Sequence, residues 1–283
     1  MALRAYLSSL PRALRLWPVA LLLFLANLAA GLCFGALAWH WLDVTLDGSA
    51  ATEMLQTHLD LNVFVDLVVH HGESMRTLLA TAAVAALAFV AGSAWCDSAV
   101  AVSVTDGTGL NASLRRGTSL LPAFLALTSV TILLQGTSVA AGFILSRSAV
   151  RWAAGSYAET TYYAALGSGF VLAAGMVFVL TTIHDHVRIR IAAASAGAIE
   201  AFVWGLRFVI RHRTRTLSLT LLLLATGVAV WGAYQVAAAR IPITSRPGLT
   251  VSLLWGEVFL FVRMLVRVWG YAATRDLQRR MTY

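Results

Sequence analysis

The sequence predicts an all-α membrane protein: a polytopic bundle of six transmembrane helices with amphipathic interfacial helices. The 283 residues are 59% hydrophobic, and the mean hydropathy is +0.77. Charged residues make up only 12% of the chain, about half the fraction usual in soluble domains. No polar linker interrupts the chain, so we expect residues 1–283 to form one integral membrane domain.

Five stretches without a charged side chain are each long enough to cross a hydrocarbon core of ~30 Å as a helix. They are 16–42, 77–96, 117–146, 160–184 and 216–239. A sixth apolar segment, 249–272, has the length but carries three charged residues, and we count it as a span. The first stretch follows several arginines, as a secretory signal does. Its uncharged run is far longer than the core of about 7 to 15 residues in a signal peptide, so we expect it to remain in the mature protein.

The distribution of arginines predicts the orientation, because short cytoplasmic segments of membrane proteins are enriched in positive charge. Most of the 21 basic residues fall on the side that holds both termini if the chain crosses six times. We therefore expect both termini to lie in the cytoplasm. The net charge of +8 indicates anionic lipid headgroups as partners rather than nucleic acid. The expected headgroup contacts are Arg4, Arg12, Arg15, Arg115, Arg116, Arg207 and Arg211.

Three segments on the cytoplasmic side have the pattern of basic helices that lie in the membrane interface. They are residues 1–16, 109–121 and 197–213, and in each an apolar stripe runs beside arginines. On the outer side, the stretch 43–74 predicts one further amphipathic helix. There, Leu61, Phe64, Val65, Val68 and Val69 fall at helical spacing.

The three basic segments indicate a threefold internal repeat of surface helix, ascending span, outer loop and descending span. Asp97, Gly109 and Gly117 recur with the same spacing as Asp185, Gly197 and Gly205. The repeat units would be about 1–103, 104–191 and 192–283. Asp97 and Asp185 thus occupy equivalent places at the inner ends of descending helices.

Three stretches carry a resemblance: "DHVRIRI" from Asp185, "AFVWGLRFVIRHRTRTLSL" from Ala201 and "VRMLVRVWGYAA" from Val262. Over most of its length the chain resembles a family of uncharacterised six-span bacterial inner-membrane proteins. More loosely, it is similar to the membrane domain that precedes some bacterial glycerophosphodiester phosphodiesterases. The chain departs from the first pattern at Arg213, where a proline is usual, and it has no phosphodiesterase domain. The resemblance therefore implies an architecture and no chemistry.

Charged residues at membrane depth are candidates for function, because each is costly unless it is paired or hydrated. A rise of 1.5 Å per residue places Arg267 level with Asp97 and Asp185, and Arg263 lies one turn away on the same face. We expect Asp97, Asp185 and Arg267 to form a buried cluster. Pairing that orients helices is the favoured interpretation, and a path for a proton or an anion is the alternative.

Glu257 lies deeper in the sixth span, at a depth similar to that of Gln135 in the third. One interpretation is a protonated Glu257 hydrogen-bonded to Gln135, because burial favours the neutral carboxylic acid. The other is that Glu257 faces a water-filled vestibule or an interfacial groove. The sequence leaves the two equally open.

The histidines lie near span ends or in loops. His184 and His186 point to different sides of a helix, so we expect them to hydrogen-bond to headgroups or water. A denser outer group contains His58, Asp60, Asp66, His70, His71 and Glu73. Its Asp66 and His70 have a spacing used by zinc sites, but no third ligand is fixed, so we expect no bound metal. We find no nucleotide, hydrolase or redox motif, and no cofactor is implied.

These observations favour a non-enzymatic membrane protein that serves as a scaffold, a partner subunit or a lipid-handling module. The sequence is compatible with a protein partner or with a second copy of the chain. The first alternative is a small ion- or proton-coupled transporter that uses Glu257 and the inner cluster of Asp and Arg. The second is an intramembrane enzyme acting on lipids, with the outer histidines and carboxylates as its site.

Overall fold

The computed structural model describes residues 1–46, 72–153, 159–241 and 246–282, and all regular structure within these ranges is α-helical. The helices are α1 (Ala2–Arg15), α2 (Trp17–Leu46), α5 (Gly72–Asp106), α6 (Leu110–Ala153), α7 (Glu159–Ala194), α8 (Ala198–Arg211), α9 (Arg213–Ala238) and α10 (Arg246–Thr282). Six of them, α2, α5, α6, α7, α9 and α10, are long and apolar enough to cross a membrane. The predicted fold class is confirmed.

The chain forms two compact units. The first comprises Met1–Leu22 and Ala94–Tyr283, and the second comprises Leu23–Ser93. Within the described residues, the second unit consists of the larger part of α2 and the first part of α5. The amphipathic outer helix expected between 43 and 74 lies mostly outside the described residues, and so do Leu61, Phe64, Val65, Val68 and Val69.

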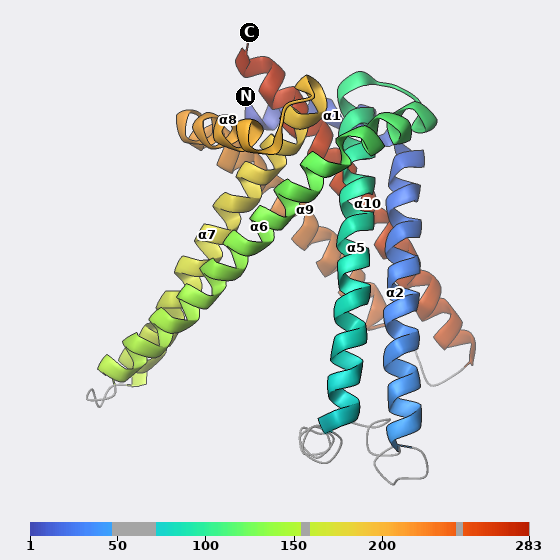
Figure 1. Ribbon diagram of the computed structural model, residues 1–283, viewed down its shortest axis with the longest axis vertical. Coiled ribbons are helices and arrows are strands. Elements are labelled where there is room, and N and C mark those ends of the chain that lie inside the picture. Colours follow the sequence, from blue (N-terminus) through green and yellow to red (C-terminus); the bar gives the residue numbers. More distant parts are fainter. Residues whose placement is uncertain (47–71, 154–158, 242–245, 283) are drawn as a thin grey trace. The chain divides into compact units, whose positions relative to one another are not determined.

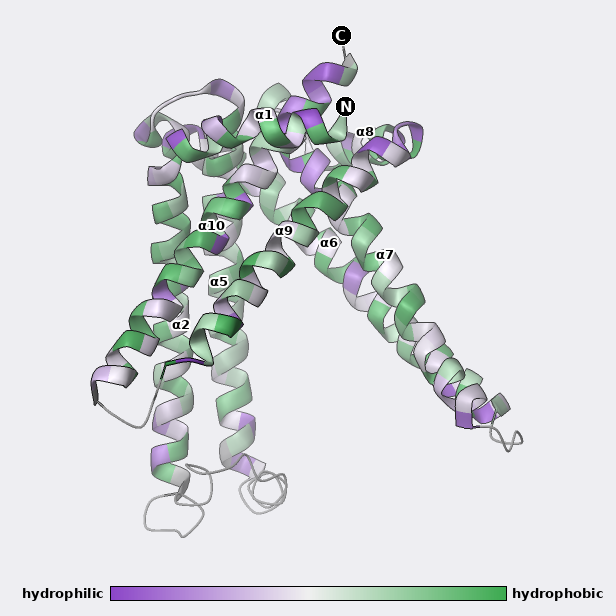
Figure 2. Ribbon diagram, turned by 180° about the vertical axis from the view of Figure 1, so that it is seen from behind, coloured by the Kyte–Doolittle hydropathy of each residue, from purple (hydrophilic) through white to green (hydrophobic). Residues whose placement is uncertain are grey.

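Two short amphipathic helices, α1 and α8, lie at the end of the first unit that also holds both chain termini (Figure 1). We call this the surface-helix end. Leu16 separates α1 from α2, and His212 separates α8 from α9. In Figure 2 several hydrophilic turns gather at this end, whereas the long helices of the same unit are mainly hydrophobic. The expected interfacial helices over 1–16 and 197–213 therefore exist as separate elements.

The third expected surface helix is not separate. Residues from Leu110 onward run without a break into the long span α6, which contains Pro122 at the point where the surface segment was expected to end. A proline inside a helix removes one backbone hydrogen bond and favours a bend, but it does not force the helix to stop. The helix therefore continues past residue 121, where the charge pattern predicts the end of the surface segment.

The surface helices pack on the bundle through small residues. In α1 the buried positions are Ala2, Ala5, Ser9 and Ala13, and in α8 they are Ala201, Gly205 and Val209. The large apolar side chains point away and stay exposed: Leu3, Leu7, Leu10 and Leu14 in α1, and Ile199, Val203, Leu206 and Ile210 in α8. Small faces allow close helix approach, and the exposed aliphatic faces are available to lipid.

The same packing recurs at positions 88 residues apart. A Cβ added to Gly117 in α6 would lie 2.9 Å from the backbone nitrogen of Ala99 in α5. A Cβ added to Gly205 in α8 would lie 2.4 Å from the Val187 side chain in α7. Gly205 follows Gly117, and Val187 follows Ala99, by 88 positions, the offset that also relates Asp185 to Asp97. These two contacts and the two aspartates therefore share one offset of 88 positions.

A contact of a different kind, made by an indole rather than at a glycine, joins the two ends of the chain. The indole of Trp269 in α10 donates to the Tyr6 carbonyl of α1 at 2.9 Å and to Ser9 Oγ at 3.0 Å. The Trp269 and Tyr6 rings also lie against each other, with centroids 4.2 Å apart. Helix α10 therefore packs against α1. In the same way, α5 packs against the start of α6, and α7 packs against α8.

The spans α6 and α7 form the most closely packed pair of helices in the first unit. A Cβ added to Gly169 would lie 2.2 Å from the Gly142 carbonyl and 2.7 Å from the Ser146 nitrogen, both backbone atoms. Ser146 Oγ also donates to the Leu166 carbonyl at 2.7 Å. The glycine at 169 is therefore required by a backbone contact that cannot shift easily.

We predict that Gly169→Ala lowers the free energy of unfolding by about 1–3 kcal/mol, because its methyl group would overlap the backbone of α6. Gly167→Ala is the matched control, since an added Cβ there meets no atom within 4 Å among the described residues. Denaturation of both variants in mixed micelles measures the difference. Equal stability of the two would contradict the packing described for α6 and α7.

Candidate functional site

The most deeply buried charge described in the first unit is the carboxylate of Asp97, near the C-terminal end of α5. Its side chain is 2% exposed. Arg267 Nη2 of α10 lies 2.8 Å from both carboxylate oxygens, and Arg188 Nη2 of α7 lies 2.8 Å from Oδ2. One carboxylate thus joins three helices of the first unit through two guanidinium groups. A charge removed from water is tolerated when it is paired in this way.

Asp185 occupies a different position from Asp97. Its Oδ1 lies 3.8 Å from Arg188 Nη1, one helical turn along α7, and its side chain is 36% exposed. The structure therefore brings Asp97 and Arg267 into direct contact and connects Asp185 to them through Arg188. Arg263 is exposed on α10 and is not among the ion pairs of the described residues.

Two residues of this cluster were not singled out from the sequence. Arg188 is not among the candidate residues predicted from the sequence, although its i, i+3 spacing from Asp185 places both on one helix face. Tyr271 follows Arg267 by four positions and is 6% exposed, and the Arg188 guanidinium lies 5.7 Å from its ring centroid. The helical spacing is the signal that could have identified both.

A cavity of about 200 Å³ adjoins the cluster between α7, α9 and α10. The polar part of its lining comes from Asp185, Arg188, Arg267, Tyr271 and Thr274, and the rest comes from Leu223, Val266 and Gly270. Asp97 does not line it. The cavity wall therefore presents two guanidinium groups, one carboxylate and two hydroxyl groups.

Gln135 and Glu257 do not form the hydrogen bond considered from the sequence. Gln135 Nε2 of α6 donates instead to Thr181 Oγ1 of α7 at 3.1 Å. Glu257 lies on α10, where its Oε2 is buried without a hydrogen-bond partner among the described residues. Equal depth on two helices does not bring side chains together when the helices are not neighbours on those faces.

The expectation that His184 and His186 face headgroups or water is wrong. His184 is 6% exposed, and its Nδ1 lies 2.7 Å from Thr131 Oγ1 of α6. His186 is 2% exposed, and Gln278 Nε2 of α10 lies 3.1 Å from its Nδ1. Because α6, α8 and α10 cover opposite sides of α7 here, both faces of this helix are interior.

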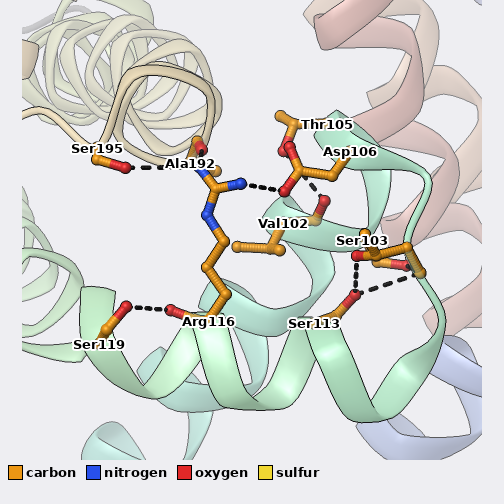
Figure 3. A network of polar contacts seen from close by, with 10 residues as sticks. Val102, Ser103, Thr105, Asp106, Ser113, Arg116, Ser119, Ala192 and Ser195 are labelled. Carbon is orange, nitrogen blue, oxygen red and sulfur yellow. Dashed lines mark hydrogen bonds and ion pairs between the residues drawn. The ribbon is translucent and has the colours of Figure 1, made fainter.

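Two of the arginines expected at lipid headgroups, Arg12 and Arg116, also make protein contacts. Arg116 forms an ion pair with Asp106 and donates to the Ala192 carbonyl at 3.2 Å, which ties α6 to the ends of α5 and α7 (Figure 3). Arg12 donates to the Val104 carbonyl at 2.6 Å. The two carbonyls are again 88 positions apart.

The environment of Arg12 is partly that of a protein interior. Burial lowers the pKa of its guanidinium from the ordinary value, the charge of Arg279 lowers that pKa further, and Asp276 raises it. An arginine remains protonated under such shifts. Arg12 therefore acts as a charged hydrogen-bond donor to the end of α5.

The other five arginines expected at headgroups are exposed: Arg4, Arg15, Arg115, Arg207 and Arg211.

The described residues contain no group of three or more metal-ligating side chains. Of the outer group of histidines and carboxylates, only Glu73 is described, and His58, Asp60, Asp66, His70 and His71 lie outside the described residues.

Comparisons of the chain with protein-family models, with curated proteins and with solved structures found no match. The function therefore has to be argued from the geometry of the cluster, the cavity and the surface helices.

We predict that Asp97→Asn lowers the free energy of unfolding by about 3 kcal/mol or more, because two buried guanidinium groups lose their counter-ion. The control is Asp276→Asn, which changes a partly exposed carboxylate that pairs with Arg280 at 3.0 Å and accepts from Ser8 Oγ at 2.7 Å. That change should cost about 0–1 kcal/mol. Denaturation in mixed micelles compares them, and an Asp97→Asn protein as stable as the control would contradict the role of this carboxylate.

Proposed function

We propose that the protein is a non-enzymatic lipid-handling module of the inner membrane, whose surface-helix end lies at the cytoplasmic leaflet and binds anionic phospholipid. One observation carries the proposal: α1 and α8 turn small residues toward the bundle and leave their aliphatic faces exposed beside exposed arginines. A helix of this kind lies in the interface, where its apolar face meets acyl chains and its arginines meet headgroups.

The packing supports a lipid-binding role in preference to a peripheral anchor. Both helices are fixed to the bundle at buried small residues, so their exposed faces are held in place before lipid binds. Pre-ordered groups lose less conformational entropy on binding. The two helices therefore present arginines to lipid as part of one folded surface.

The arrangement gives less support to transport. The cavity beside Arg267 does not include Glu257 among its lining residues, so the two polar places proposed for an ion path are not joined by that cavity. For an intramembrane enzyme, the candidate residues lie almost entirely outside the described ranges. Both functions remain secondary proposals.

We predict that Arg207→Gln with Arg211→Gln reduces the preference of the protein for phosphatidylglycerol over phosphatidylcholine severalfold. Each arginine near an anionic surface contributes about 1 kcal/mol of attraction. The control is Arg207→Lys with Arg211→Lys, which keeps both charges and should keep the preference. Spin-labelled lipids in mixed nanodiscs measure the bound fraction, and an unchanged preference in the glutamine variant would refute the proposal.

The orientation has its own test. We predict that single cysteines placed at Arg4 and Arg211 react with an impermeant maleimide only after inside-out vesicles are prepared, because positive charge favours the cytoplasmic side. The control is a cysteine at Arg147, at the other end of α6, which should react from the opposite side. Labelling of Arg4 and Arg211 positions from outside intact cells would contradict the proposed topology.

A further inference from the structure

The cavity between α7, α9 and α10 contains polar groups that the protein does not satisfy. Tyr271 Oη and Arg188 Nε are both buried and have no hydrogen-bond partner among the described residues. Buried polar atoms without partners are rare in folded proteins, because each loses its hydrogen bonds to water. A bound group inside the cavity that accepts a hydrogen bond from Tyr271 would satisfy that hydroxyl group.

The charges around the cavity define what such a group must look like. Arg188 and Arg267 are held from behind by Asp97, which neutralises one of the two guanidinium charges. Asp185 lines the same cavity and forms a longer ion pair with Arg188, at 3.8 Å compared with 2.8 Å for Arg188 and Asp97. A simple anion would meet the arginines and be repelled by Asp185. A ligand with one negative and one positive group would satisfy both sides.

The size of the cavity agrees with a ligand of several heavy atoms. Its volume of about 200 Å³ corresponds to about six or seven water molecules at ~30 Å³ each. This is more than one ion requires. It provides room for a phosphate and an ammonium group separated by a short chain.

The cavity lies at a level in the protein where a lipid headgroup could bind. Gly205 of the surface helix α8 packs against Ile183 and Val187 of α7, on either side of Asp185 in the sequence. Trp269 of α10 packs against the surface helix α1 close to Arg267 and Tyr271. The charged lining therefore lies at the level of the surface helices, which is the depth of the headgroup region if these helices are interfacial.

We propose that this cavity binds a phosphate–amine group of the phosphoethanolamine type. The guanidinium of Arg267 and the hydroxyl of Tyr271 contact the phosphate, and the carboxylate of Asp185 contacts the ammonium. Arg188 remains between the two, paired to Asp97. This site is separate from the exposed arginines of α1 and α8, and it goes beyond the proposed affinity for anionic lipid. Its ligand chemistry is shared by a phosphatidylethanolamine headgroup and by free phosphoethanolamine.

The experiment measures binding to the full-length protein in detergent with three probes: dihexanoyl-phosphatidylethanolamine, free phosphoethanolamine, and dihexanoyl-phosphatidylglycerol, which lacks the amine. We expect the first to bind at least tenfold more tightly than the third. Tighter binding of the lipid than of free phosphoethanolamine identifies the lipid headgroup as the source, and the reverse identifies the soluble compound. Either result supports the cavity.

The variants avoid Arg188, Arg267 and Asp97, because these residues hold the helices together. Tyr271→Phe removes only a hydroxyl group and should weaken binding of dihexanoyl-phosphatidylethanolamine about tenfold, since hydrogen bonds to charged groups are strong. Asp185→Asn should weaken it similarly and abolish the preference over phosphatidylglycerol. The controls are Tyr234→Phe and Glu257→Gln, which make the same chemical changes at positions that do not line the cavity.

Two results would overturn the proposal: equal binding of the lipids with and without the amine, or unchanged affinity in both Tyr271→Phe and Asp185→Asn. Thermal unfolding of each variant, measured alongside, establishes that the protein is folded. Neither result bears on the phosphatidylglycerol preference of the glutamine variant of α8, so failure of the cavity and failure of the proposed function are distinguished.

Discussion

The shared ion pair of Asp97 is the constraint on which the rest of the first unit depends. A single carboxylate near the end of α5 receives guanidinium groups from α7 and α10, and so links three helices of the first unit at one level. The ion pair also explains why the chain tolerates Arg267 inside an apolar span, since an unpaired arginine at this depth is costly. Because Asp97 is enclosed, neither arginine can move away without leaving a buried charge behind.

The surface helices are arranged around this centre by a second constraint, the need for small side chains where helices cross. Gly117, Gly205 and Ser9 allow the start of α6, α8 and α1 to lie directly on α5, α7 and α10. This places three amphipathic segments at the level of the charged cluster. The charged cluster and the exposed arginines of the surface helices therefore belong to one layer of the molecule.

Much of this fold follows from the sequence, because hydrocarbon leaves few alternatives for an apolar segment of 20 or more residues. The pairing of Asp97 with Arg267 could be expected from helical rise alone, since both had to find a partner at the same depth. The role of Arg188 could not be settled in this way, because a charge at a span end is equally well placed to face headgroups. Glu257 and Gln135 show the same limit, because the rotation of each helix about its axis depends on packing.

The histidines show why burial at the ends of the spans is harder to predict from the sequence than the spans themselves. His184 and His186 lie where a membrane helix would leave the bilayer, and an isolated helix would expose them. They are buried because α7 continues to Ala194 and is covered there by α6, α8 and α10. Packing of neighbouring helices therefore buries two residues that the local sequence pattern predicts to lie at an interface. This burial depends on tertiary contacts, which the local pattern does not predict.

The most direct test of the central claim is a double-mutant cycle between Asp97 and Arg267. The account predicts that Asp97→Asn combined with Arg267→Gln lowers the free energy of unfolding by at least about 1 kcal/mol less than the sum of the single changes, because the partners share one buried interaction. Effects that add to within about 0.5 kcal/mol would contradict it, since they would mean that the two side chains do not interact in the folded protein.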